Sequence, residues 1–152
     1  MAPETSDAQV SLLVIGYGNT LRSDDGVGSR VAEAVQELDL PGVTALSCAL
    51  LTPELADPIS KAGRVIFVDA AVDAPAGVEL RPISAAETTQ ILAHAADPCT
   101  LLALARDVFG QIPKAWWLTI PVENLGIGEE LSEKARRGFD RAVAEIRKMA
   151  KA

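Results

Sequence analysis

The stretch VSLLVIGYGNTLRSDDGVG, residues 10–28, joins an apolar run, a glycine-rich loop and the first residues of a helix. The run Val10–Ile15 ends at a glycine and is almost continuously apolar, which is typical of a strand buried on both faces of a parallel sheet. Apolar residues then recur at helical spacing as far as Leu38, and Pro41 and Gly42 end the helix. This order predicts a strand and a helix joined by a loop at the carboxyl end of the strand.

The same alternation continues along the chain. Further strands are predicted at residues 43–48, 64–70, 77–83 and 116–122, and further helices at residues 53–61, 98–109 and from 132 onward. Thr52 and Asp97 each precede a proline, which is the pattern of a helix cap followed by proline at the first helical position. We therefore predict an α/β fold with one domain at residues 10–152. It is a three-layer α/β/α sandwich with a mostly parallel sheet of about five strands.

Composition excludes several classes of protein. The net charge of −7 argues against a nucleic-acid partner, and no apolar run approaches the ~18 residues of a membrane span. Residues 1–9 lack the basic and apolar regions of a secretion signal and are predicted to be a disordered tail. Cys48 and Cys99 form no Cys-x-x-Cys pair, so two reduced thiols in the cytoplasm are expected. We expect a cytoplasmic monomer.

The glycine loop raises the alternative of a nucleotide-binding module. Gly16 and Gly18 supply two glycines of a dinucleotide-binding fingerprint, but Leu21 stands where the third is required. Asp24 and Asp25 lie where a helix N-terminus otherwise attracts phosphate, and their charges would repel it. The loop therefore favours a cation, and we predict no nucleotide cofactor.

Three side chains form the candidate metal-recognising set: Asp25, Asp69 and His94. In open α/β sheets ligands bind beyond the carboxyl ends of the strands, and a 2-1-3 strand order would bring the first loop beside Asp69. Each residue also has a structural interpretation, since either Asp24 or Asp25 can cap the following helix, Asp69 can cap a loop and a lone histidine is often incidental. Two carboxylates and an imidazole suit nickel, zinc, manganese or iron, and three ligands leave positions open for substrate or water.

These residues resemble those of the [NiFe]-hydrogenase maturation endopeptidases. The motif VIGYGNTLRSDDGVG at residues 14–28 is similar to that family's opening signature of an apolar strand, Gly-x-Gly-Asn and Asp-Asp/Glu-Gly-x-Gly. Further similar stretches follow in the family's order: LTPELADPI at 51–59, VIFVDAA at 65–71, LLALARDVFGQIPKAWWLTIP at 101–121 and GEELS at 128–132. The resemblance covers the chain from about Leu12 to its end.

The resemblance implies an α/β/α sandwich and an endopeptidase. Such enzymes remove the C-terminal extension of the hydrogenase large-subunit precursor after nickel insertion, cutting just after a Cys-x-x-Cys-x-x-His/Arg motif. Their metal-recognising residues match Asp25, Asp69 and His94, and the two aspartates are also the candidate catalytic residues. The nickel is carried by the substrate, and another divalent metal can replace it in vitro. The surrounding loop is expected to bind substrate through Gly16, Gly18, Asn19, Asp24 and Gly26.

The sequence departs from the family pattern at a few positions. Many relatives have glutamate where Asp25 stands, so the metal is expected closer to this loop. The segment ILAHAADP lacks the serine or second histidine often found beside the ligand, and SCALLTPEL lacks the usual glutamine. For the reaction we favour metal-assisted hydrolysis over a pair of catalytic aspartates. A non-proteolytic metal-sensing chaperone of hydrogenase assembly remains an alternative function.

Overall fold

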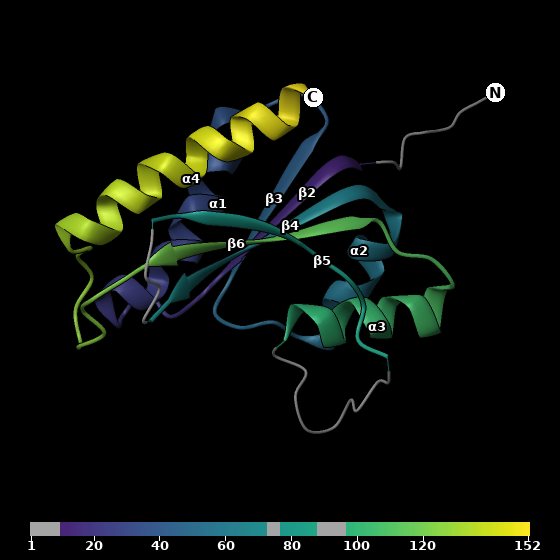
Figure 1. The fold of residues 1–152 in the computed structure, drawn as a ribbon, viewed down its shortest axis with the longest axis horizontal. Helices are drawn as coiled ribbons and strands as arrows, with labels where there is room; N and C mark the ends of the chain where they lie inside the picture. The colour runs from purple at the N-terminus through teal and green to yellow at the C-terminus, as the bar shows by residue number, and fades with distance from the viewer. Residues whose placement is uncertain (1–9, 73–76, 88–96) are drawn as a thin grey trace.

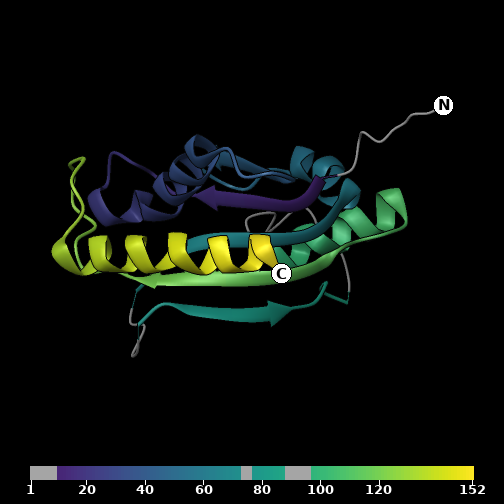
Figure 2. The same cartoon turned by 90° about the horizontal axis from the view of Figure 1, so that it is seen from above.

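The computed structural model describes residues 10–72, 77–87 and 97–152. Within these ranges the strands form one five-stranded sheet in the order β3-β2-β4-β6-β5. They are β2 (Val10–Tyr17), β3 (Val43–Cys48), β4 (Ala62–Ala71), β5 (Glu79–Ile83) and β6 (Lys114–Pro121). All pairs are parallel except that of β5 with β6, and Figure 2 shows β5 at the sheet edge, running against its neighbour. The predicted, mostly parallel sheet is confirmed.

Two helices cover each face of the sheet (Figure 1). One layer contains α1 (Val27–Leu38) and α4 (Glu133–Lys151), and the other contains α2 (Ala56–Lys61) and α3 (Pro98–Phe109). Alternate residues of β2 serve opposite layers: Leu12 and Val14 pack with α1 and α4, whereas Leu13 and Ile15 pack with α2 and α3. This burial on both sides explains the apolar run and confirms the three-layer α/β/α sandwich.

The helix ends agree with most of the capping signals. The Asp97 carboxylate accepts hydrogen bonds from the backbone N–H groups of Cys99 (2.6 Å) and Thr100 (3.4 Å), as predicted. Gly110 ends α3 with a left-handed backbone, φ 83°. The expected cap at Thr52 is wrong, because its side chain makes no capping hydrogen bond. The residues after Thr52 form a short 3-10 helix, η2 (Pro53–Leu55), and the α-helix α2 begins only at Ala56.

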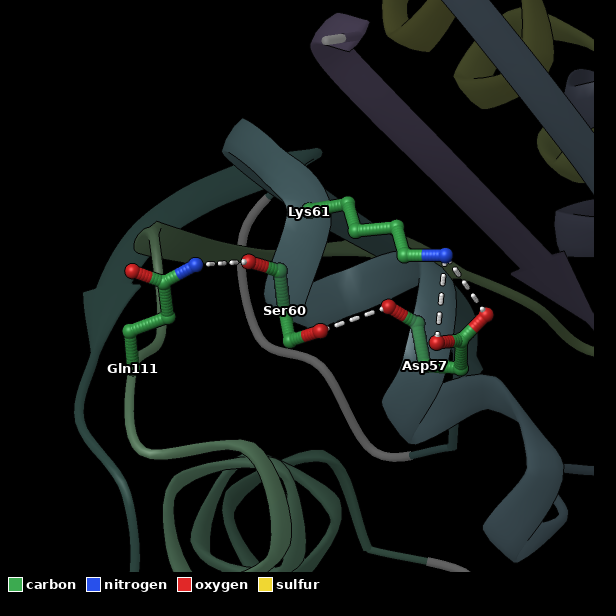
Figure 3. A network of polar contacts seen from close by, with 4 residues as sticks. All are labelled: Asp57, Ser60, Lys61 and Gln111. Atoms are coloured by element: carbon green, nitrogen blue, oxygen red, sulfur yellow. Dashed lines mark hydrogen bonds and ion pairs between the residues drawn. The ribbon is translucent and has the colours of Figure 1, made fainter. Parts of the chain in front are cut away.

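A polar network ties α2 to the segment after α3 (Figure 3). The Gln111 side-chain amide donates to the carbonyl oxygen of Ser60 at 3.2 Å, and the Ser60 hydroxyl donates to the carbonyl oxygen of Asp57 at 2.7 Å. Lys61 pairs with the Asp57 carboxylate one turn earlier, at 3.4 Å. These contacts satisfy polar groups at the end of a short helix and join it to the segment after α3.

Some expectations fall outside the described residues. They concern the tail at residues 1–9, most of the loop that leads to α3, and His94 itself. Among the helices of the described ranges, none is both long and apolar enough to span a membrane.

Candidate functional site

The first loop and the end of β4 meet at one edge of the sheet. Strands β2 and β4 are parallel neighbours, with Ile15 opposite Phe67 and Gly16 opposite Val68. The loop after β2 and Asp69 near the end of β4 therefore leave the sheet side by side, at its carboxyl edge. This confirms the 2-1-3 strand order on which the prediction of the site depended.

Asp25 lies in η1 (Ser23–Gly26) and is half-buried. One oxygen of its carboxylate, Oδ2, accepts a hydrogen bond from the backbone N–H of Asn19 at 2.8 Å. The Asn19 side-chain oxygen in turn accepts from the N–H of Leu21 at 2.9 Å, which folds the loop into a tight turn. Neither aspartate caps α1, because its N-cap residue is Gly26 and no side chain bonds there. The hydrogen bond from Asn19 to Asp25 thus closes the loop and holds the Asp25 carboxylate at the carboxyl edge of the sheet.

The loop glycines pack against the protein's own backbone. A Cβ on Gly18, where φ is 144°, would lie 2.0 Å from the carbonyl oxygen of Asp25. A Cβ on Gly28 would lie 2.3 Å from the carbonyl oxygen of Val68, so α1 begins in direct contact with β4. The same kind of contact occurs at Gly16, which meets α1, and at Gly26, which meets Thr20. These contacts explain why glycine is needed at these positions without a bound phosphate. A substrate contact remains a prediction for Gly16, Gly18, Gly26 and Asn19.

Asp24 does not belong to the exposed part of the loop. It is fully buried, and its carboxylate accepts four hydrogen bonds: from the N–H groups of Glu123 and Asn124 (both 3.0 Å) and from the N–H and hydroxyl of Ser132 (both 2.7 Å). Burial alone would raise the pKa of Asp24, but these donors outweigh it and lower the pKa. The expected substrate contact of Asp24 is therefore wrong, since the residue anchors the segment between β6 and α4.

Asp69 is half-buried and lies on the face covered by α2 and α3. Its Oδ2 accepts a hydrogen bond from the phenolic hydroxyl of Tyr17 at 3.0 Å. Burial raises the pKa of Asp69, and the charge of Asp25 adds to the rise, whereas the hydrogen bond from Tyr17 and the donors nearby oppose it. The two predicted carboxylates therefore lie within electrostatic range of each other. Asp69 holds a proton more readily than an ordinary aspartate.

Tyr17 was not among the residues singled out from the sequence. Burial and then the charge of Asp69 raise the pKa of Tyr17, so its hydroxyl stays protonated and acts as a donor. The charge of Asp97 contributes as well, which places the start of α3 within electrostatic range of Tyr17. The Trp117 indole N–H is buried near Asp69 and favours the ionised form of its carboxylate. It makes no hydrogen bond with any of the described residues. The alternation of side chains along β2 would have placed Tyr17 on the face that Asp69 shares.

Two of the three predicted ligands lie at the same edge of the sheet. Asp25 lies in the loop after β2 and Asp69 near the end of the neighbouring strand β4, whereas His94 lies outside the described residues. Within the described ranges, no three histidine, cysteine, aspartate or glutamate side chains gather as a potential metal site. The convergence of the full set therefore remains a prediction.

The cysteines do not resemble activated nucleophiles. Both are free, and burial raises the pKa of each thiol. Cys48 ends β3 with its sulfur 3.8 Å from the carbonyl oxygen of Gly16, and Cys99 lies in the first turn of α3. A protonated thiol is a poor nucleophile, so these two side chains do not supply one.

One hollow of the described surface lies away from this site. It has a volume of about 610 Å³ and lies between α1 and α4, lined by Arg30, Glu33, Phe139 and their neighbours. Asp69 and Tyr17 occupy the other face of the sheet, and none of the predicted site residues lines the hollow. The hollow is lined by both acidic and basic side chains, which favour no particular ligand. We therefore assign the candidate site to the carboxyl edge, on the chemistry of its side chains.

Comparison with solved structures reveals the same fold in a group of proteases. The hydrogenase maturation protease HybD from Thermococcus kodakarensis superposes with a TM-score of 0.74 at 22% identity, over 92% of this chain and 99% of that one. The hydrogenase maturating endopeptidase HybD from E. coli gives 0.71 at 21% identity, over 90% and 89%. The maturation protease HycI from T. kodakarensis gives 0.70 at 24% identity, over 94% of each chain.

No protein-family model and no curated protein sequence matches the chain. The structural likeness extends over nearly the whole length of each partner, so it concerns the complete domain and not a shared fragment. The chain has the fold of the hydrogenase maturation endopeptidases.

Proposed function

We propose that this protein is an endopeptidase that removes the C-terminal extension of a [NiFe]-hydrogenase large-subunit precursor after nickel insertion. The observation that carries the proposal is the placement of Asp25 and Asp69 at one edge of the sheet, where the loop after β2 and the end of β4 leave neighbouring parallel strands. The two residues are 44 positions apart in the sequence, and the 2-1-3 strand order brings them together. Proteins named as hydrogenase maturation proteases share this fold.

The carboxyl edge also has the surface of a site for a protein substrate. Large apolar side chains are exposed in the loops that follow all four parallel strands: Leu21, Leu50, Val72 and Ile127. Ile127 is 98% exposed, and the adjacent Gly128 N–H donates to the carbonyl oxygen of Leu21 at 2.9 Å, so two of these loops are joined. Exposed apolar groups around a polar centre are typical of a protein-binding surface. They support a polypeptide substrate over a small molecule.

The proposed site recognises nickel that the precursor carries. Asp25 and Asp69 offer oxygen donors, and His94 would add the nitrogen donor, a set that suits nickel. His94 precedes Asp97 by three residues, which a chain bridges over at most about 10 Å. Asp97 itself acts electrostatically on Tyr17, the hydrogen-bond partner of Asp69. The electrostatic effect of Asp97 on Tyr17 supports the proposal that His94 joins the two carboxylates.

Hydrolysis needs a polarised carbonyl, an attacking water and a proton for the departing amine. The nickel supplies a Lewis acid beside the scissile bond. Asp69 binds a proton more readily than an ordinary aspartate, so it is suited to accept a proton from water and return it to the amine. Asp25, whose carboxylate accepts a hydrogen bond from the Asn19 N–H, is held in place and orients the centre.

The test incubates the purified protein with the nickel-loaded precursor and follows the mass of the large subunit. We expect the wild-type protein to release the extension, and Asp25→Ala, Asp69→Ala and His94→Ala each to lose cleavage while retaining the circular dichroism of the fold. Asp140→Ala, an exposed substitution on α4, is the matched control and should cleave normally. Full activity of the three site variants would contradict the site, and binding of the precursor without cleavage would favour a chaperone.

A further inference from the structure

Tyr17 and Asp69 are joined across the sheet although 52 residues separate them in the chain. Tyr17 is the last residue of β2, and Asp69 lies near the end of the neighbouring strand β4. Their side chains share the face covered by α2 and α3, and the phenolic hydroxyl donates to Oδ2 of the carboxylate at 3.0 Å. The hydroxyl group therefore contacts a residue of the candidate site directly.

The contact restricts the carboxylate. A free aspartate at a strand end can rotate about its terminal bond, because that torsion is broad. A hydrogen bond to one oxygen from a ring held in the packed layer removes this freedom. It also engages a lone pair of Oδ2 and so favours the other lone pairs of the carboxylate for contact with a ligand. Packing alone does not require the hydroxyl, since phenylalanine would fill the same space.

This inference rests on the proposed function. We propose that Tyr17 is a positioning residue, whose phenolic hydroxyl holds the Asp69 carboxylate in the orientation in which it meets the metal-bearing end of the precursor. The neighbouring groups support this role, because Tyr17 packs against the same hydrophobic cluster as Trp117, and this cluster includes Leu101 of α3. The hydroxyl acts through Asp69 and does not itself touch the substrate.

The test compares steady-state cleavage of the nickel-loaded precursor by the wild-type protein and by Tyr17→Phe. Groups that orient a metal-binding side chain contribute about 10–100-fold to activity, so kcat should fall by that factor. KM should change little, because most of the contact with a large protein substrate lies elsewhere on the edge. An unchanged kcat would overturn the proposal.

The control is Ser47→Ala, which removes a hydroxyl group on the adjacent strand β3, on the opposite face. There the Ser47 hydroxyl contacts Ser29 and Glu33 of α1 and has no link to Asp69. This variant should retain both kcat and KM, and a drop equal to that of Tyr17→Phe would show a general effect of lost hydroxyls.

A second measurement separates the two proposals. The coupling between Tyr17→Phe and Asp69→Ala, which removes the acceptor of the hydrogen bond, is measured in chemical denaturation, which needs no substrate. Absence of coupling would overturn the contact whatever the activity. If the wild-type protein does not cleave, the proposed function fails, and a measurable coupling would then leave the contact as a structural one without a role in cleavage.

Discussion

Ser132 donates two hydrogen bonds to the carboxylate of Asp24, one from its backbone N–H to Oδ1 and one from its hydroxyl to Oδ2, both at 2.7 Å. The same hydroxyl oxygen accepts the N–H of Ala135 at 3.1 Å and so caps α4. The buried carboxylate therefore connects the first loop to the start of the last helix. This connection fixes the first loop, which contains Asp25, but Asp24 is not itself part of the candidate site.

Removing this charge should destabilise the whole domain. In Asp24→Asn one oxygen acceptor is replaced by a donor that faces the N–H groups of Glu123 and Asn124, so hydrogen bonds to a charged group are lost at a fully buried position. We expect the free energy of unfolding to fall by about 2–4 kcal/mol. Urea denaturation measures it, with the exposed Asp140→Asn as a control expected to change by less than about 0.5 kcal/mol. Equal stability of the two variants would contradict the role of Asp24.

Acid should weaken the same connection. The pKa of Asp24 in the folded protein lies below its ordinary value of 3.8, so its contribution is fully present above that value and is lost as the pH falls through the lowered pKa. The wild-type protein should therefore lose more stability than Asp24→Asn when the pH is lowered below 3.8. Thermal unfolding of both proteins at a series of pH values measures the difference. Parallel curves for the two proteins would contradict the assignment.

Asp69 should show the opposite behaviour. Its pKa is raised in the folded protein, because burial and the charge of Asp25 disfavour the ionised form, so ionisation destabilises the fold as the pH rises above 3.8. Asp69→Asn keeps an oxygen acceptor for Tyr17 and carries no charge. We expect this variant to be more stable than the wild-type protein at pH 7 and to lose that advantage below pH 3.8. A variant that is less stable at pH 7 would show that the charge of Asp69 is structural.

Gly28 should resist a substitution that normally stabilises a helix. Alanine within a helix is favoured over glycine by about 1 kcal/mol, but here a Cβ would lie 2.3 Å from the carbonyl oxygen of Val68 and 2.8 Å from that of Tyr17. Overpacking of this kind costs about 1–3 kcal/mol, so Gly28→Ala should destabilise the protein and displace the first loop. Gly77→Ala is the control, since a Cβ there would meet no atom within 4 Å. A more stable Gly28→Ala would show that α1 can move away from β4.

The sequence was sufficient for the architecture because its signals are local. An apolar run marked β2, and the pair of Asp97 and Pro98 marked the start of α3. It could not separate Asp24 from Asp25, since neighbouring carboxylates look alike until the segment at residues 123–132 is seen to enclose one of them. Adjacent residues in a 3-10 turn point in different directions, and this separates the buried anchor Asp24 from the half-buried candidate ligand Asp25.

The hydrogen bond between Tyr17 and Asp69 was hidden for a different reason. It depends on strand order and register together, because the residues meet only when β2 and β4 are parallel neighbours with the pairing observed. Thr52 shows the converse error, since a residue of the right type precedes a proline and yet its side chain makes no cap. Long-range contacts and side-chain rotamers are not encoded in short motifs.

The most direct test of the central claim concerns the metal in the substrate. The described residues include two carboxylates at the edge, and the proposed site recognises nickel that the precursor presents. Purified protein is mixed with the large-subunit precursor, with and without nickel, and release of the C-terminal extension is followed by mass spectrometry. The account predicts cleavage of the nickel-loaded precursor and an intact nickel-free precursor. Equal cleavage of both would contradict it.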